Sequence, residues 1–197
     1  MRKQFGWSDD TQIILFVGYL IEKKGIRYLL TAMPKIIAEL PDAQLVLVGA
    51  GTELEQLKQQ TKDLEIEDHV TFMGWVKNSD LPDYYLDADV FVLPSIVDSK
   101  GETETQGVVL AEAMVCGCPV VGSNVGGIPD VITPEVGLLA EPKNSHDLAK
   151  KIVMILSDIE THKKMSQAAI SWAREHFSWQ SVSRKYLEIY NEILNDN

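Results

Sequence analysis

Two glutamates, Glu104 and Glu112, bound the stretch of this sequence that is best suited to chemistry. Glu104 ends a polar loop, and the apolar residues after it predict a helix over residues 107–116. The first N–H groups of a helix have no partner within it and lie at the positive end of its dipole. Backbone N–H groups here can therefore bind an anion such as a diphosphate. They belong to Thr105, Gln106, Gly107, Val108 and Val109.

Glu112 is a charged residue inside this otherwise apolar helix, on the face that carries Val108. A carboxylate in apolar surroundings costs free energy unless it has a hydrogen-bonding partner. Its two oxygens can accept bonds from the two hydroxyl groups of a ribose, which would supply such a partner. The alternative is that Glu112 pairs with another side chain of the fold.

A pair of carboxylates also suggests a glycoside hydrolase, but the spacing disfavours that class. If the segment were helical throughout, the step from Glu104 to Glu112 would span about 12 Å. Retaining glycosidases hold their carboxyl groups about 5–5.5 Å apart, and inverting ones about 6.5–9.5 Å apart. Because a loop begins the segment, the sequence leaves the true distance open.

Lys24 lies in the loop after the first apolar run of the chain, directly before Gly25. A lysine at this place can meet a phosphate as a point charge, although most loop lysines are simply solvated. Residues 49–51, Gly-Ala-Gly, occupy the same place after the second apolar run. Leu54 stands where a dinucleotide fingerprint would have its third glycine, so we expect a tight turn there instead.

Short apolar runs alternate with longer amphipathic segments over most of the chain. Strands are predicted over 13–18, 44–49, 70–74, 90–94, 119–122 and 136–140. Helices are predicted over 26–40, 52–64, 81–88 and 107–116. Strands separated by helices pair in parallel, and runs that are apolar throughout are typical of sheets covered on both faces. We therefore predict an α/β fold with a Rossmann-like, doubly wound parallel sheet of about six strands.

Small residues follow the predicted strands. They are Gly18, Gly49, Gly74, Ser95 and Gly122. In doubly wound sheets, ligands bind beyond the carboxyl ends of the strands, and small residues let a ligand approach the backbone. The binding site is therefore expected in the loops after these positions.

The chain after Pro142 is predicted to be entirely helical. Its last apolar stripe is strong for a terminal helix, so we expect it to cover the sheet or a missing partner domain. This stripe consists of Tyr186, Leu187, Tyr190, Ile193 and Leu194. Pro34 falls within the helix predicted over 26–40 and is expected to kink it or end it early.

The composition limits the classes of partner and site. The 197 residues suit one domain, and the net charge of −11 disfavours nucleic acid as a partner. No apolar run approaches the ~20 residues of an integral membrane segment, and no signal peptide is evident. We therefore expect a cytoplasmic location. Any peripheral contact with a membrane would be made by another domain. Cys116 and Cys118 are too close for an unstrained disulfide and are expected to be packing residues. The four histidines lie in separate segments, which disfavours a metal site.

Taken together, these motifs resemble the C-terminal donor-binding domain of the retaining glycosyltransferases of family 4, which have the two-domain GT-B fold. The seven residues between Glu104 and Glu112 match the spacing of that family's paired glutamates. Residues 112–121 and 126–132 are similar to two further family stretches, with Asp130 where glutamate is usual. The resemblance runs from about residue 13 to the C-terminus.

The resemblance implies a role for each of these positions. Glu104 would lie against the donor sugar, Lys24 would bind the diphosphate, and Glu112 would hold the ribose. The backbone of Val76 would meet the base, and Val108 would pack near the ribose. The implied reaction is transfer of a hexosyl group from a UDP-, GDP- or ADP-sugar with retention of configuration. It needs no metal and no cofactor, because Lys24 and the helix start would stabilise the leaving diphosphate.

Two departures from the family pattern matter. After Gly18, where the family usually has an arginine that meets the donor, the chain has Tyr19, so another cation such as Lys23 or Lys100 would have to substitute. The N-terminal acceptor domain has no counterpart, so residues 1–197 are expected to be a single nucleotide-sugar-binding domain, the C-terminal half of a two-domain enzyme, inactive alone. A non-catalytic nucleotide-sugar-binding module and a nucleotide-sugar epimerase remain alternatives.

Overall fold

The computed structural model describes residues 1–195 and contains one sheet of six parallel strands. The strands are β1 (Ile13–Val17), β2 (Gln44–Val48), β3 (Val70–Gly74), β4 (Val90–Leu93), β5 (Val120–Ser123) and β6 (Gly137–Ala140). Their order across the sheet is β3-β2-β1-β4-β5-β6, and every adjacent pair is parallel. The predicted Rossmann-like, doubly wound sheet is confirmed, and each observed strand end lies within one residue of its predicted position.

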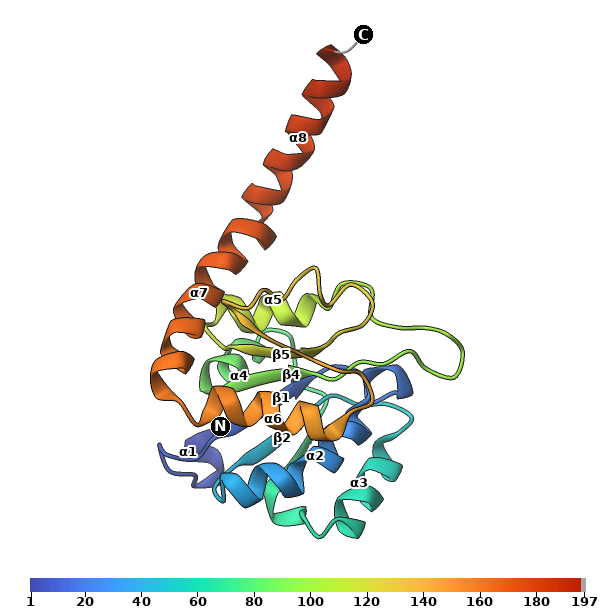
Figure 1. Ribbon diagram of the computed structural model, residues 1–197, viewed down its shortest axis with the longest axis vertical. Coiled ribbons are helices and arrows are strands. Elements are labelled where there is room, and N and C mark those ends of the chain that lie inside the picture. The colour runs from blue at the N-terminus through green and yellow to red at the C-terminus, as the bar shows by residue number, and fades with distance from the viewer. Residues whose placement is uncertain (196–197) are drawn as a thin grey trace.

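Helices cover both faces of this sheet (Figure 1). They are α1 (Arg2–Phe5), α2 (Ile26–Glu39), α3 (Leu54–Asp63), α4 (Leu81–Asp87), α5 (Val108–Val115), α6 (Ser145–Leu156), α7 (Ile159–Phe177) and α8 (Trp179–Asn195), with 3-10 turns η1 (Glu22–Lys24) and η2 (Glu67–His69). α2 packs against α3 and α6, while α5 packs against α4 and α7. The two groups of helices thus enclose the strands.

The core lies along the central strands. All residues of β1 and β4 are buried, and Phe16 and Phe91 are fully enclosed. Burial of each such ring stabilises the fold by roughly 1.5–3 kcal/mol. Because both strands are fixed along their whole length, the loops that leave their carboxyl ends begin at well-defined positions.

The loops after β1 and β2 pack backbone against backbone. A Cβ atom on Gly49 would lie 1.8 Å from the carbonyl oxygen of Gly18, and one on Gly51 would lie 2.2 Å from that of Leu20. These glycines are therefore needed for close approach, and the tight turn expected from the sequence is confirmed. The turn leads into α3, which begins at Leu54.

The last helix does not cover the sheet. Figure 1 shows α8 extending away from the body of the molecule, and the residues of its apolar stripe are 56–73% exposed. The expectation that this stripe covers the chain's own sheet is wrong, because α8 follows α7 after the single residue Ser178 and continues outward. Contact with a partner domain stays a prediction. Among the described residues, no helix is long and apolar enough to span a membrane.

Pro34 lies within α2, and the helix continues past it to Glu39. The expected early end of this helix is therefore wrong. The residues on either side explain why: Leu30, Met33 and Ile36 are all fully buried, and their packing holds the backbone helical. Tertiary packing outweighs the lost hydrogen bond at Pro34.

We predict that Pro34→Ala stabilises the protein. Pro34 is exposed and cannot donate to the carbonyl of Leu30, whereas alanine restores that bond without removing a buried contact. Allowing for the greater freedom of the unfolded chain, the gain should be about 1–2 kcal/mol in the free energy of unfolding. Urea denaturation measures it, and a loss of stability would instead show that α2 requires proline-specific geometry.

Candidate functional site

The centre of the site is an ion pair between the loops that follow β1 and β4. Lys24 in η1 donates to the carboxylate of Glu104, and each side chain is only 13% exposed. The hydroxyl of Ser95 also approaches the Glu104 carboxylate, at 3.4 Å. β1 and β4 are neighbours in the sheet order, at the point where the chain changes direction across the sheet. Ligands of doubly wound folds bind at this switch point.

Close backbone contacts bring the two loops together. Gly25 ends η1 with φ of 64°, and a Cβ atom there would lie 2.1 Å from the carbonyl oxygen of Pro94. The N–H of Ile96 donates to the carbonyl of Lys23 at 2.8 Å. Glycine at position 25 therefore allows the loop after β1 to press against the loop after β4. The position of Lys24 follows from that packing.

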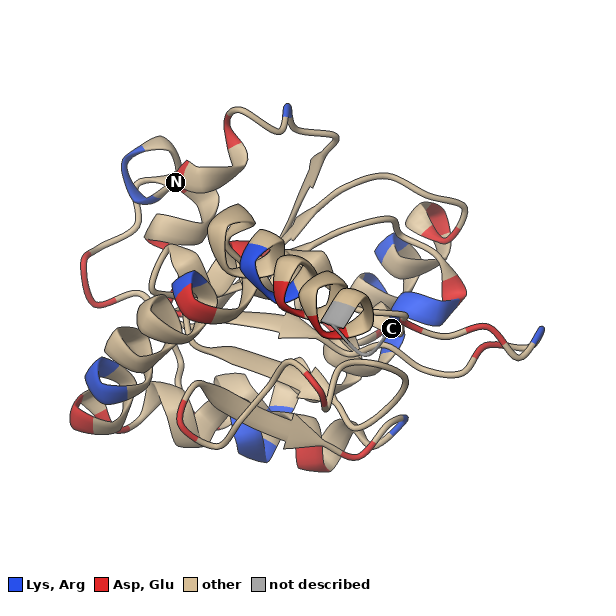
Figure 2. Ribbon diagram, turned by 90° about the horizontal axis from the view of Figure 1, so that it is seen from above, with Lys and Arg blue, Asp and Glu red and all other residues tan. Residues whose placement is uncertain are grey.

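The polar loop before Glu104 folds back on the same segment. Asp98 accepts bonds from the N–H groups of Lys100 and Glu102, which closes its turn. Ser99 donates to Glu22 at 2.7 Å, and Lys23 lies 3.5 Å from Glu102. In Figure 2 this extended loop, at the right, carries both signs of charge. One cation proposed to substitute for the family arginine, Lys23, thus already faces a carboxylate.

The start of α5 lies beside this ion pair in the sequence and is open to a ligand. Gly107 occupies the N-cap position with φ of 68°, and no side chain of the described residues caps it there. Leu110 donates back to the carbonyl of Gly107 at 2.8 Å. Thr105, Gln106 and Val108 are all exposed. The N–H groups ahead of Leu110 therefore remain suited to an anion.

Glu112 accepts a hydrogen bond from the hydroxyl of Tyr85 at 2.8 Å. Tyr85 lies on α4 and is 2% exposed, whereas Glu112 is exposed. Burial, followed by this bond to Glu112, raises the pKa of the Tyr85 hydroxyl, so it remains a donor. Glu112 thus does pair within the fold, as the alternative interpretation expected. One bonded carboxylate oxygen still leaves capacity for a ligand hydroxyl.

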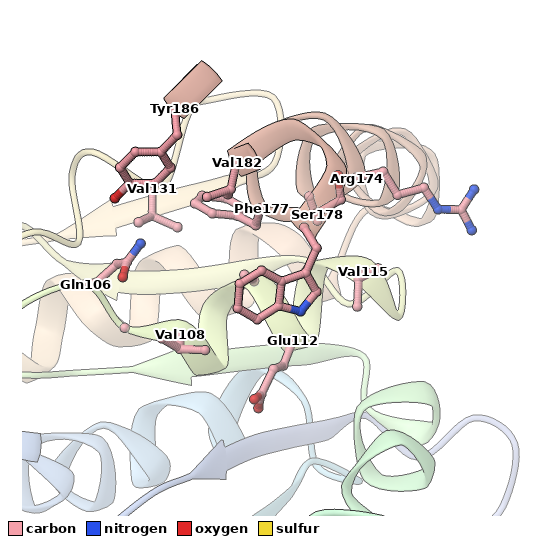
Figure 3. A pocket seen from close by; sticks show the side chains of 14 residues that line it. Gln106, Val108, Glu112, Val115, Val131, Arg174, Phe177, Ser178, Val182 and Tyr186 are labelled. Carbon is pink, nitrogen blue, oxygen red and sulfur yellow. The ribbon is translucent and has the colours of Figure 1, made fainter. Parts of the chain in front are cut away.

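A pocket of about 580 Å³ lies between α5 and the junction of α7 with α8. Figure 3 shows Val108 and Val115 on one wall and Phe177, Val182 and Tyr186 on the other. The carboxylate of Glu112 points away from these rings, on the side of its bond with Tyr85. This largely apolar pocket shares the start of α5 and Glu112 with the predicted site, whereas Lys24 and Glu104 do not line it.

The other predicted residues lie at the same edge of the sheet. Gly18 donates to Val48 at 3.0 Å as it leaves β1, and Tyr19 beyond it is 72% exposed. Val76 is half-buried two residues after β3 and packs against the core. The structure brings Lys24 and Glu104 into contact, with Tyr19 and the start of α5 on the adjoining segments. Glu112 lies further along α5.

Sequence reasoning missed Tyr85. It lies in a helix predicted correctly, but its contact with Glu112 depends on how α4 packs against α5. No local pattern reports such a contact. The only hint was the unexplained carboxylate in the apolar helix, which required a donor from elsewhere.

The cysteines and histidines form no chemical centre in the part of the chain that the structure describes. Within residues 1–195, no group of three or more His, Cys, Asp or Glu side chains could hold a metal ion. Both cysteines are free, and burial raises the pKa of each thiol. Cys118 is 1% exposed and belongs to the core, and Cys116 is partly buried against that core. The expected packing role of both cysteines is confirmed.

The family described as "Glycosyl transferases group 1" matches residues 1–172. This match covers most of the chain, and the fold and the glutamate spacing agree with it. The chain therefore belongs to the group 1 glycosyltransferases.

Two relatives show the range of the family. An uncharacterized glycosyltransferase of Methanocaldococcus jannaschii is 37% identical over 96% of this chain and 47% of its own length. A GDP-mannose-dependent monoacylated phosphatidylinositol monomannoside mannosyltransferase of Corynebacterium glutamicum is 31% identical over 95% and 49%, respectively. The chain thus spans about half the length of these curated relatives.

Two solved structures share the fold of this chain, and one of them is a C-terminal domain. A structure of Anabaena HepE in complex with UDP-glucose superposes with a TM-score of 0.83 and 26% identity, covering 97% of this chain and 51% of that one. The C-terminal domain of LpcC, a group 1 glycosyltransferase family protein of Francisella tularensis, gives a TM-score of 0.76 at 26% identity over 85% and 87%. The fold is that of a C-terminal GT-B domain.

We predict that Tyr85→Phe lowers the free energy of unfolding by about 1 kcal/mol, because it removes a hydrogen bond to a carboxylate. Tyr84 on the same helix is the matched control, since it is half-buried and its pKa is raised by burial and Asp80 rather than by Glu112. Tyr84→Phe should change stability by less than about 0.5 kcal/mol. Equal effects in urea denaturation would show that the Tyr85–Glu112 bond contributes nothing specific.

Proposed function

We propose that this chain is the donor-binding domain of a retaining, metal-independent hexosyltransferase. The observation that carries the proposal is the Lys24–Glu104 pair at the switch point of the sheet, next to the uncapped start of α5. A cation, a carboxylate and free N–H groups at one sheet edge suit an anionic ligand that also carries hydroxyl groups. A nucleotide-diphosphate sugar has both features.

In this proposal the diphosphate lies between Lys24 and the start of α5. The ammonium group has three donors, so Lys24 can hold Glu104 and a phosphate oxygen together. The helix dipole contributes about 0.3–1 kcal/mol per anionic group at an exposed site and up to about 2 kcal/mol when partly buried. Hydrogen bonds between charged partners add about 1.5–3 kcal/mol each. A site of this kind needs no metal to stabilise the leaving group.

In this proposal one glutamate binds the sugar of the donor and the other binds its ribose. Glu104, held by Lys24, can accept bonds from sugar hydroxyls, and Glu112, steadied by Tyr85, can accept bonds from the ribose. Val108 is 61% exposed and can pack against the ribose. The backbone of Val76 would meet the base. One similar protein is named as GDP-mannose-dependent, and another was solved in complex with UDP-glucose. We therefore take these two nucleotide sugars as candidate donors for this chain.

The proposed transfer requires a second domain for the acceptor. An acceptor hydroxyl oxygen would bond to the anomeric carbon of the donor while the bond to the phosphate oxygen breaks. The acceptor proton would pass to the departing nucleotide diphosphate, and the anomeric configuration would be retained. Because the chain spans about half the length of its curated relatives, we propose that residues 1–197 bind the donor but transfer nothing alone. We also propose that the complete protein acts in the cytoplasm.

Tyr19 favours one alternative, a non-catalytic module that binds nucleotide sugar. Its side chain is exposed and brings no positive charge to the leaving group, and Lys23 is engaged with Glu102. A module of this kind would bind donors with the same residues. It would differ in the consequence of changing Glu104 in a protein that contains both halves.

The first test is calorimetric titration of the chain with UDP, GDP and ADP, with and without the sugar. Lys24→Ala should weaken nucleotide binding about 10–100-fold, because the cation is lost and Glu104 is left as an uncompensated charge. Glu112→Gln, which keeps an acceptor for Tyr85, should weaken it about 3–10-fold. Exposed Lys150 and Glu175 provide controls. Unchanged affinity in both site variants would refute the proposed site.

A second test concerns the chemistry in a protein that joins this chain to its N-terminal domain. Glu104→Gln should abolish most sugar transfer while leaving nucleotide affinity within about threefold, since the change is confined to the sugar side of the site. Transfer should persist in EDTA, and NMR of the product should show retained configuration. Normal turnover by Glu104→Gln would favour the non-catalytic module.

A further inference from the structure

We propose that the loop containing Gly126 and Gly127 is a positioning element for the site. Gly126 would set the backbone position of Glu104, and Gly127 would set that of Thr105. The inference rests on the proposed function, because it assigns each glycine to a part of the donor. It concerns a stretch whose resemblance to the family left its role in this chain unexplained.

The contacts are between backbones. A Cβ atom on Gly126 would lie 2.0 Å from the carbonyl oxygen of Glu104, and one on Gly127 would lie 1.9 Å from that of Thr105. The N–H of Gly127 also donates to the carbonyl of Glu104 at 3.2 Å. Gly126 has φ of 58°, a conformation that favours glycine. Gly126 therefore packs on the carbonyl of Glu104, whereas Gly127 packs on that of Thr105 and also donates to that of Glu104.

The loop cannot retreat from these contacts, because the core holds its other side. Ile128 is fully buried, and a Cβ atom on Gly122 of β5 would lie 2.6 Å from its Cγ2 atom. Val131 is also buried, and its carbonyl accepts a bond from the indole N–H of Trp172 on α7 at 3.1 Å. The loop is thus fixed between β5 and α7, and Glu104 and Thr105 rest against its exposed edge.

A methyl group on either glycine would consequently move the site rather than the loop. Carbon atoms of this kind essentially never come within 3.0 Å of a neighbour, so the Glu104 or Thr105 carbonyl would shift by about 1 Å. Such a shift is large for a group that must meet a ligand hydroxyl or phosphate. At Gly126 it acts first on the Glu104 carboxylate, and at Gly127 on the N–H groups that begin α5.

The experiment compares affinities for UDP, UDP-glucose, GDP and GDP-mannose by calorimetry with residues 1–197. The readout is the sugar gain, defined as the Kd of the nucleotide divided by the Kd of its sugar conjugate. Gly126→Ala should lower the sugar gain about tenfold and leave the nucleotide Kd within about threefold. Gly127→Ala should raise the Kd of nucleotide and conjugate alike, about tenfold.

Gly6→Ala is the matched control, since Gly6 has φ of 69° and a Cβ atom there would have nothing within 4 Å of it. Like Gly126 it has a positive φ, but it lacks the contact, so every Kd should stay within about twofold. In a Glu104→Gln background, Gly126→Ala should cause no further loss of sugar gain, because both changes act through one carboxylate. A merely destabilising change would not reproduce this non-additivity.

Two failures can be told apart. If the unaltered chain binds none of the four ligands, the proposed function fails. If it binds them and the folded Gly126→Ala protein keeps its full sugar gain, or adds its loss to that of Glu104→Gln, the positioning role is wrong. Should Gly126→Ala not fold, Ile128→Val loosens the same loop by one buried methyl group. It should lower the sugar gain about two- to threefold, and no change would overturn the inference.

Discussion

The ion pair between Lys24 and Glu104 exists because two buried strands, β1 and β4, lie side by side in parallel, so that the loops after them leave the same edge of the sheet. From β1 the chain crosses toward β2, and from β4 it crosses the other way toward β5. Neither loop could place its charged residue without the other: Gly25 rests on the carbonyl of Pro94, and the ammonium of Lys24 compensates a carboxylate that is largely shielded from water. The sheet order thus determines where a cation and an acid meet. The helix start and the glycine pair at 126–127 are arranged around that meeting point.

Much of this arrangement could be read from the residues themselves. β1 and β4 are uninterrupted apolar runs, so their positions and parallel pairing followed from burial on both faces. Membership of the group 1 glycosyltransferases was likewise expected from the glutamate spacing together with residues 112–121 and 126–132, and it is confirmed. The prediction that Lys24 and Glu104 serve one site depended on their places after strands and on the family resemblance. Their direct contact was not foreseen.

Features that depend on packing between distant segments could not be predicted. Pro34 was expected to kink α2 or end it early, but buried neighbours on both sides keep the helix running to Glu39. Tyr85 gave no signal because its partner is brought in by another helix. The stripe on α8 correctly indicated an amphipathic helix, yet an apolar stripe does not say what covers it, and in this chain it faces outward.

The start of α5 has a consequence for how an acidic protein can recognise an anion at all. Backbone N–H groups carry partial charges that sum to no net charge, and the field of such a dipole fades within about a helical turn. The chain as a whole, at −11, repels polyanions over the longer range set by ionic screening. A small diphosphate that reaches the loop edge in the proposed site would meet attraction only at contact. In the proposed donor site, short-range dipoles on a negative body would therefore admit compact anions and keep extended ones away.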